Sequence, residues 1–207
     1  MPDLLAPGLP DELGESLVRE DYKRDFRERR AALRDGESWK LERLQHFEET
    51  NDESRDALRQ GDWPGVLRLF EAERDALTRR ARDDAARGAA FHRIRVVEEP
   101  LTPYVQWELN WLRLTAECGH SVRVLPAAAV AAAEADTPLP ELNLLDGRVL
   151  YRVLYTDAGR PDGAVRFTDP DLVRNWAEYL AELYEAAEDV QTYFDRAVAD
   201  LPPPPAA

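Results

Sequence analysis

The sequence predicts an α/β (α+β) fold, in which a helical N-terminal region is followed by a mixed sheet and a long C-terminal helix. Three observations carry this prediction. Residues 92–125 have the pattern of strand, helix and strand, residues 142–167 contain short apolar runs separated by turn residues, and residues 173–194 keep helical apolar spacing. This order of elements favours a βαβ unit and a β-meander in one sheet, closed by a helix.

Residues 1–88 are expected to form a mostly helical N-terminal region. From residue 12 to residue 34, apolar residues recur at near-helical spacing among many charged ones. This helix is not expected to present a basic patch, because acidic residues interrupt its basic ones: Glu20, Asp21, Asp25 and Glu28.

The rest of the N-terminal region contains one ambiguous segment and two predicted helices. Residues 39–47 fit either a helix or an early strand. A short helix is predicted at residues 53–60. Asp62 and Pro64 then open a second helix that continues to Gly88.

The composition changes after Gly88, where a second domain is predicted over residues 89–200. Residues 92–98 alternate around a β-branched centre, which indicates a strand. Thr102 is placed to cap a helix, and two apolar stripes along that helix imply burial on both sides. Residues 121–125 form the next strand, so this stretch predicts a right-handed βαβ unit with parallel strands.

The meander is predicted from three strands at residues 142–145, 148–155 and 163–167. Asp146-Gly147 is a hairpin turn signal between the first two. An alanine-rich stretch at 127–135 is predicted to be a short helix that precedes them.

Asp169 is predicted to open a final helix that continues to Phe194 without a break. Two uses of its apolar stripe are open, namely packing on the chain's own sheet and a homodimer seam. The Pro-rich residues 201–207 are expected to be disordered. The stripe consists of Val173, Trp176, Leu180, Leu183, Ala187, Val190 and Phe194.

Charge and composition narrow the classes of function. The formal net charge is −14, which repels phosphate backbones and anionic lipids, so direct nucleic-acid binding and membrane binding are not expected. No apolar run approaches the roughly 20 residues that cross a bilayer. The N-terminus lacks the features of a secretory signal, and Cys118 is the only cysteine, so a cytoplasmic protein is expected.

Motifs for metal, cofactor or nucleophilic chemistry are not evident. Cys118 and His120 lie close together in sequence without a third ligand, while His46 and His92 are isolated. There is no glycine-rich phosphate loop and no serine in a nucleophile-elbow context. No metal, no cofactor and no catalytic residue are therefore predicted.

One polar cluster is a candidate ligand site. Ligands of parallel α/β sheets bind beyond the carboxyl ends of strands, and Glu99, Tyr104 and Trp107 follow the carboxyl end of the strand predicted at residues 92–98. An arginine inside a sheet must find an anion, so the alternative is an internal Arg–Glu pair that ties the helical region to the sheet. The predicted ligand-binding residues are Arg93, Arg95, Glu99, Tyr104, Trp107 and Arg123.

Several segments resemble an actinobacterial family of uncharacterised domains. The stretch from Arg93 to Tyr104 is similar to its R-V-R-V-V-S-E-P-L-S-x-Y pattern, and Gly119 to Leu125 is similar to G-x-x-V-R-x-L. Tyr155 to Arg160 resembles a further landmark, Y-D-x-x-G-R. Genes of this family often lie beside helix-turn-helix regulators, so the resemblance implies a regulatory or toxin–antitoxin-like role without a known activity.

The half from Arg93 onward also resembles one repeat of the phospholipase D fold. In that alignment Asp146 matches the motif aspartate, but Leu139 stands at the histidine and Glu141 at the lysine. The phosphohistidine chemistry needs an imidazole nucleophile and a cation for the phosphate. The resemblance therefore implies a copy without phospholipase D activity.

The leading hypothesis is a non-enzymatic regulatory or interaction protein. It would act through a protein partner, a helix-turn-helix DNA-binding regulator, and would sense a small ligand in the Arg95/Glu99/Tyr104/Trp107 cleft. The alternative is an enzyme of specialised metabolism that uses the same cleft.

Overall fold

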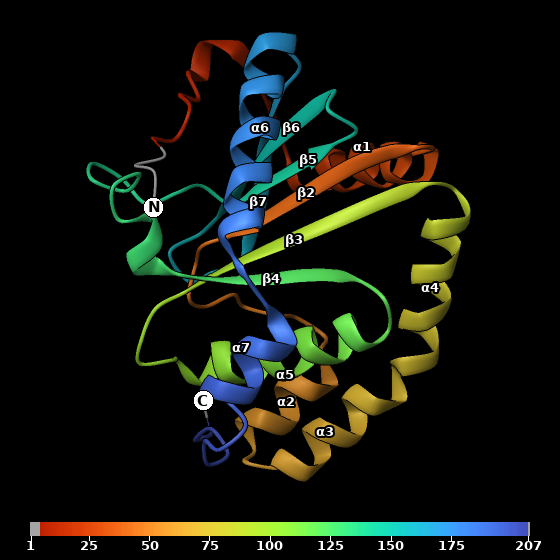
Figure 1. The fold of residues 1–207 in the computed structure, drawn as a ribbon, viewed down its shortest axis with the longest axis vertical. Helices are drawn as coiled ribbons and strands as arrows, with labels where there is room; N and C mark the ends of the chain where they lie inside the picture. The colour runs from red at the N-terminus through yellow and green to blue at the C-terminus, as the bar shows by residue number, and fades with distance from the viewer. Residues whose placement is uncertain (1–4, 207) are drawn as a thin grey trace.

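The computed structural model describes residues 5–206 and contains one eight-stranded mixed sheet with the order β1-β7-β6-β5-β2-β3-β4-β8 (Figure 1). The predicted α/β class is confirmed. The strands are β1 (Gly14–Leu17), β2 (Gly36–Glu42), β3 (Ala89–Val97), β4 (Ser121–Pro126), β5 (Leu142–Leu145), β6 (Val149–Tyr155), β7 (Pro161–Phe167) and β8 (Glu188–Asp189).

Helices cover both faces and one end of this sheet. The longer ones are α1 (Arg19–Ala32), α2 (Glu53–Arg59), α3 (Trp63–Ala72), α4 (Arg74–Ala86), α5 (Pro103–Glu117), α6 (Pro170–Ala186) and α7 (Val190–Ala197). Two 3-10 turns, η1 (Asp11–Leu13) and η2 (Ala127–Val130), complete the described elements. None of the helices within residues 5–206 has both the length and the apolar character needed to cross a bilayer.

The predicted βαβ unit is present and forms the parallel part of the sheet. Strands β3 and β4 pair in parallel, with Arg93 opposite Val122 and Arg95 opposite Val124. Between them runs α5, which begins where expected because the Thr102 hydroxyl oxygen accepts a hydrogen bond from the Val105 amide.

The meander is also confirmed as the antiparallel part. Strands β5, β6 and β7 pair in sequence order, and Asp146 and Gly147 make the first turn with φ of 55° and 59°. The connection has three residues, Asp146 to Arg148, because Leu145 pairs with Val149, and its first two residues adopt the left-handed conformation. The alanine-rich stretch, by contrast, is only the 3-10 turn η2 followed by irregular backbone.

The N-terminal region contributes two strands to this sheet and is not purely helical. The ambiguous segment forms β2, which pairs in parallel with β3 and antiparallel with β5. The single helix expected over residues 12–34 is β1 followed by α1, and β1 pairs with β7 at the sheet edge. The boundary predicted at residue 88 therefore does not separate a helical unit from a sheet unit in space.

Two predicted long helices are interrupted. The helix expected from residue 62 to residue 88 bends at Glu73, which ends α3 and precedes α4. The C-terminal helix stops at Ala187, because Glu188 and Asp189 leave it to pair with the edge of β4. Asp189 then caps α7 through the amides of Gln191 and Thr192.

The apolar stripe of the C-terminal segment is used inside the chain. All seven of its residues, Val173 to Phe194, are buried, with exposed fractions of at most 7%. The stripe is therefore packed on the protein's own sheet and helices and is not presented as a homodimer seam.

The tail predicted to be disordered is partly packed. Residues 201–206 form no helix or strand, but the Gln106 side chain donates a hydrogen bond to the Pro202 carbonyl, and Pro204 is buried. Residue 207 and residues 1–4 lie outside the described part of the chain.

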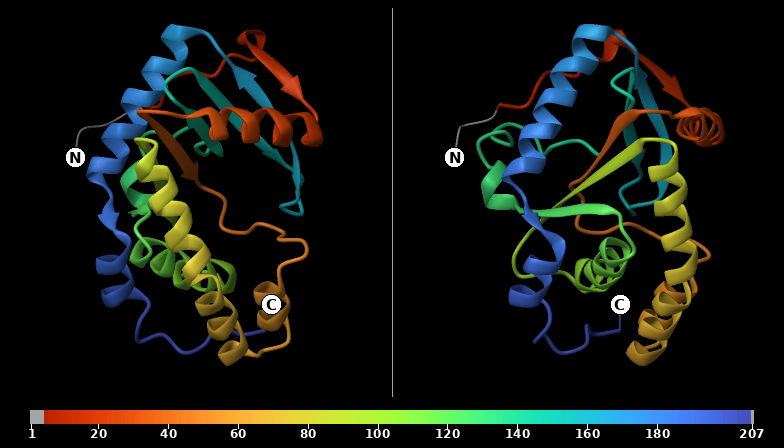
Figure 2. Two further views of the ribbon diagram at one scale, coloured as in Figure 1. Left: turned by 90° about the vertical axis from the view of Figure 1, so that its right-hand side faces the viewer. Right: turned by 45° about the vertical axis from the view of Figure 1, so that its right-hand side comes forward.

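The two faces of the central strands differ in character, and helices cover both (Figure 2). Helix α6 lies on one face, over an apolar layer that includes Trp39, Leu41, Ile94, Val96, Leu142, Leu144 and Leu150. Helices α1 and α4 lie on the other side, with α5 at the lower end. That second face presents Lys40, Glu42, Arg93, Arg95 and Asn143 from β2, β3 and β5.

Candidate functional site

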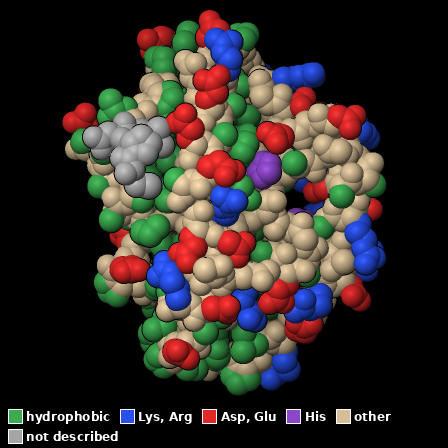
Figure 3. All heavy atoms as spheres, viewed as in Figure 1, with side chains coloured by type: hydrophobic (Ala, Val, Ile, Leu, Met, Phe, Trp, Pro, Cys, Tyr) green, Lys and Arg blue, Asp and Glu red, His purple; other side chains and the backbone are tan. Residues whose placement is uncertain are grey.

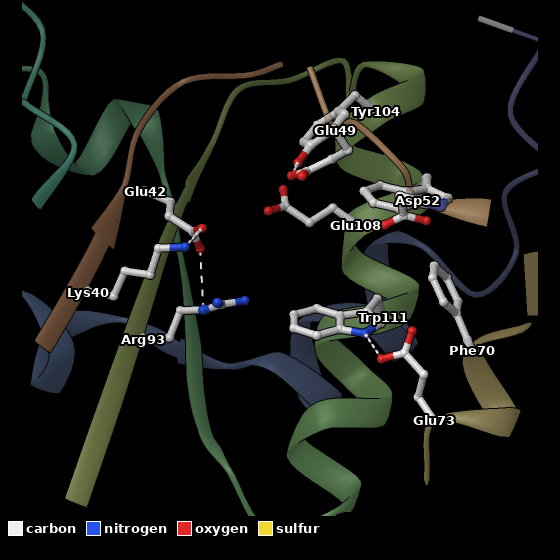
Figure 4. A pocket seen from close by; sticks show the side chains of 11 residues that line it. Lys40, Glu42, Glu49, Asp52, Phe70, Glu73, Arg93, Tyr104, Glu108 and Trp111 are labelled. Carbon is white, nitrogen blue, oxygen red and sulfur yellow. Dashed lines mark hydrogen bonds and ion pairs between the residues drawn. The ribbon is translucent and has the colours of Figure 1, made fainter. Parts of the chain in front are cut away.

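A pocket of about 200 Å³ lies between the second face of the sheet and the helices at its lower end (Figure 4). We call it the acidic pocket. Its wall consists of Lys40, Glu42, Glu49, Asp52, Phe70, Glu73, Arg93, Tyr104, Trp107, Glu108 and Trp111.

Strands β2 and β3 supply the charged side of this pocket. Side chains alternate along a strand, so Lys40 and Glu42 point to the same face, as do Arg93 and Arg95. The parallel register places Lys40 beside Arg93 and Glu42 beside Arg95. Four charged side chains thus share a small area of a buried sheet face, where each needs a partner of opposite charge.

Helix α5 supplies the aromatic side. Tyr104, Trp107, Glu108 and Trp111 follow one another at spacings of three, one and three residues, which places them on one face of the helix. The Thr102 cap fixes this face relative to the sheet, because its hydroxyl group also donates to the carbonyl of Gln45, just beyond β2.

Glu42 is the centre of the charged cluster. It forms an ion pair with Lys40, and its Oε2 lies 3.4 Å from Nε of Arg93 (Figure 4). Although its carboxyl group is buried, these neighbouring cations lower its pKa to about 2. Glu42 is therefore ionised at neutral pH.

Arg95 and Glu108 form a second buried ion pair beneath the acidic pocket. Arg95 is fully buried, and its Nε donates to Oε2 of Glu108 at 2.7 Å. Its Nη1 donates to the carbonyls of Glu42 and Val96. Burial is the largest influence on Glu108 and raises the pKa of its carboxyl group.

Three further carboxylates at the rim have no basic partner within the part of the chain that the structure describes. Glu49 accepts from the Tyr104 hydroxyl group at 3.2 Å, and Glu73 lies 3.5 Å from the Trp111 indole nitrogen. Asp52 caps α2 through one oxygen. The pocket therefore holds five carboxylates and only two cations in its wall, Lys40 and Arg93.

A buried arginine stands behind the aromatic side chains. Arg55 is 2% exposed and lies over the rings of Tyr104 and Trp107, 5.1 Å and 5.6 Å from their centroids. Its Nε and Nη1 have no hydrogen-bond partner among the described residues, and burial lowers its pKa. This cation holds both rings in place through cation–π contacts.

The structure brings only part of the predicted ligand site together. Arg93, Tyr104 and Trp107 line the pocket as expected. Arg95 lies beneath it and corresponds to the alternative of an internal Arg–Glu pair. Its partner is Glu108, a residue that the predicted site did not include.

Glu99 and Arg123 lie elsewhere. Glu99 is exposed, and the chain turns away there through a cis Glu99-Pro100 peptide bond. Arg123 pairs with Ile94, so alternation points it to the opposite, α6-covered face. There its Nη1 donates to the carbonyl of Tyr184.

Most of the acidic pocket was not predicted from the sequence. Glu108 and Trp111 could have been found from their spacing to Tyr104 and Trp107 along α5. Lys40 and Glu42 required the strand assignment of an ambiguous segment. Nothing local distinguishes the remaining lining residues, Glu49, Asp52, Phe70 and Glu73, from other residues of helical and loop segments.

Within residues 5–206, no group of three or more histidine, cysteine, aspartate or glutamate side chains is arranged to hold a metal ion. Cys118 is a free, buried thiol. Its sulfur donates to the carbonyl of Arg74 at 3.6 Å.

Comparison with known proteins assigns the chain to a family. No protein with curated information matches the sequence. The profile of the family described as domain of unknown function DUF6879 matches residues 24–195, which begin within α1, end within α7 and include every residue of the acidic pocket. The chain belongs to this DUF6879 family.

Proposed function

We propose that this domain is a non-enzymatic regulatory or interaction module that senses a small cationic ligand in the acidic pocket and acts through a protein partner. The observation that carries the proposal is the excess of carboxylates around aromatic rings. Glu49, Asp52 and Glu73 have no basic partner within the described residues, and they surround the side of the pocket built by Tyr104 and Trp111.

The chemistry of the wall favours an amine or a guanidinium group. Carboxylates accept charge-assisted hydrogen bonds from such groups, and aromatic faces attract them through cation–π interactions. The ligand would add positive charge beside Glu49, Asp52 and Glu73, whereas Glu42 and Glu108 already have cations as partners. An anionic ligand would meet repulsion from the same groups.

Calorimetric titration with butylamine, putrescine and arginine tests the proposal, with butyrate as the probe of opposite charge. We expect saturable binding of at least one amine, and butyrate should not compete with it. Glu73→Gln should weaken amine binding about tenfold, because a charged hydrogen bond contributes roughly 1.5–3 kcal/mol. Asp75→Asn is the matched control, since Asp75 is exposed and lies outside the pocket. Two results would overturn the proposal: no saturable binding of any of the amines, or displacement of the bound amine by butyrate.

The partner we propose is a helix-turn-helix DNA-binding regulator. The net charge of −14 supports docking on a basic protein and disfavours direct contact with DNA. Resemblance to an actinobacterial family encoded beside such regulators also supports it. Purification from the native host under gentle conditions should recover the regulator, and the complex should dissociate or tighten on addition of the amine. Recovery of the domain alone, with no partner under any ligand condition, would contradict this part of the proposal.

We also propose that the half from Arg93 onward is a degenerate phospholipase D-like repeat. The residues that align with the phospholipase D motif have structural roles in this chain, which supports the proposal. Leu139 belongs to the apolar core, Glu141 accepts hydrogen bonds from the amides of Arg43 and Leu44, and Asp146 makes the β5–β6 turn. A phosphodiesterase assay with a chromogenic diester should therefore give no turnover above background.

An enzyme using the same pocket is the second candidate. Glu108 favours it, because a carboxyl group with a pKa raised by burial is what a general acid requires. Product analysis distinguishes the sensor from the enzyme. Incubation with a bound amine and product analysis by mass spectrometry should return the amine unchanged if the domain is a sensor, and a product absent from Glu108→Gln would favour the enzyme.

A further inference from the structure

A second cavity, of about 270 Å³, lies between α4 and strands β3 and β4. In the space-filling view the surface is hollowed beside α4, with basic and histidine side chains at its edge (Figure 3). Its charged and polar wall residues are Arg30, Arg80, Arg93, His120, Thr115 and Ser121. No aspartate or glutamate is among the residues that line it. We call it the arginine hollow.

The carboxylates that reach these arginines do not neutralise them. Asp84 binds Arg30 at 2.5 Å but also pairs with Arg87, and Glu42 is shared between Arg93 and Lys40.

Arg80 has no carboxylate within 4 Å among the described residues. The wall therefore carries three arginines and no carboxylate, and each carboxylate that reaches them is shared with a cation outside the wall, Arg87 or Lys40. Burial lowers the pKa of His120, so its ring adds no positive charge at neutral pH.

The basic region continues onto α1, where Lys23, Arg27 and Arg30 recur at helical spacing on one face. A neighbouring hollow of about 500 Å³ shares Arg30 and Arg80, and its other charged residues are Lys23, Arg27, Arg87 and one carboxylate, Asp84. The acidic residues that interrupt the basic ones in the sequence of α1 are absent from this wall; Asp25, for example, contacts Tyr151 and Arg166 instead. A protein with a net charge of −14 thus concentrates cations in one place.

We propose that the arginine hollow binds an oxyanion, the phosphate or carboxylate group of a small ligand. Arginine offers a planar set of donors that matches both groups, and the hydroxyl groups of Thr115 and Ser121 lie in the same wall. Phe91 and Trp111 stand beneath Arg30 and Arg93, at 5.0 Å and 5.2 Å, and orient the two guanidinium groups. The site does not depend on an amine being bound in the acidic pocket.

Calorimetric titration of the full chain at constant ionic strength tests this site, with pyrophosphate and citrate as separate probes. We expect one-to-one binding of at least one of them, and the tighter probe identifies the phosphate or the carboxylate class. Arg80→Ala should weaken that binding about tenfold or more. Arg79→Ala is the matched control, because Arg79 is exposed like Arg80 and adjoins it on the same helix but lines neither hollow.

Arg80→Ala should leave butylamine or putrescine binding within twofold of wild type, which separates this site from the acidic pocket. Two results would overturn the inference: no saturable binding of either oxyanion, or an equal loss in Arg79→Ala and Arg80→Ala. The latter would mean a diffuse charge effect and not a site.

Discussion

The two faces of the central strands provide the most informative comparison in this molecule. On the face covered by α6, Leu41, Ile94 and Leu144 are completely buried in an apolar layer. One residue further along the same strands, Glu42 and Arg95 are equally inaccessible but charged. The same backbone therefore supports a hydrophobic core on one side and a charged cluster on the other.

The difference shows which face is maintained for stability. Apolar burial contributes about 25 cal/mol per Å² and needs no particular geometry. A buried ion pair gains little over a hydrophobic pair of the same size, because both ions lose their hydration. The charged face thus stabilises the fold less than apolar residues of the same size would. It lies where the acidic pocket and the arginine hollow meet, since Arg93 and Trp111 line both.

The largest expected effect is on the charged face. Arg95→Met should lower the free energy of unfolding by about 3–5 kcal/mol, because it leaves Glu108 buried without its cation. The double variant Arg95→Met/Glu108→Leu should recover most of this loss. Urea denaturation of the three proteins measures both effects. A loss below about 1 kcal/mol in Arg95→Met would mean that the pair does not hold this face together.

A similar or slightly smaller effect is expected on the apolar face. Leu144→Ala should cost about 2–5 kcal/mol through lost burial and the cavity that remains. Because this side chain points away from both pockets, amine and oxyanion affinities of the folded variant should stay at wild-type values. A selective loss of ligand binding would show that the two faces are coupled.

The pH dependence of stability should come from the charged face. Burial raises the pKa of Glu141 to about 7 from its ordinary value of 4.5. The folded chain therefore retains a proton that the unfolded chain releases between these pH values, so this group makes the protein less stable as pH rises through the window. The expected loss is on the order of 2–3 kcal/mol between pH 4.5 and pH 8.

Glu141→Gln isolates that contribution, since its amide oxygen can still accept from the amides of Arg43 and Leu44. The variant should match wild type near pH 4.5 and exceed its stability at pH 8, as measured by urea denaturation at each pH. Parallel pH profiles for the two proteins would assign the dependence to other groups.

The smallest effects compare the helices that cover the two faces. Thr102 caps α5 and Asp169 caps α6, so Thr102→Ala and Asp169→Ala should each cost about 1 kcal/mol. Only Thr102→Ala should also weaken amine binding, because α5 carries Tyr104 and Trp107 into the acidic pocket. Thermal denaturation and calorimetric titration of both variants provide the test, and an equal loss of affinity in the two would contradict it.

Local patterns in the sequence were sufficient for the βαβ unit, the meander and several helix starts. Their signals are short-range: alternation in residues 92–98, the Asp146-Gly147 turn, and the capping residues Thr102 and Asp169. The same alternation places Arg93 and Arg95 on one face of their strand. These features depend on neighbours within a few residues, so they can be recognised in a single sequence.

Long-range pairing accounts for what the sequence did not show. The break at Ala187 follows from the pairing of β8 with β4, and the central place of β2 follows from its pairing with β3 and β5. The acidic pocket joins segments separated by up to about seventy residues, from Lys40 to Trp111. Which carboxylate neutralises Arg95, and which cations remain without one, depends on distances between these segments, and local periodicity carries no information about such distances.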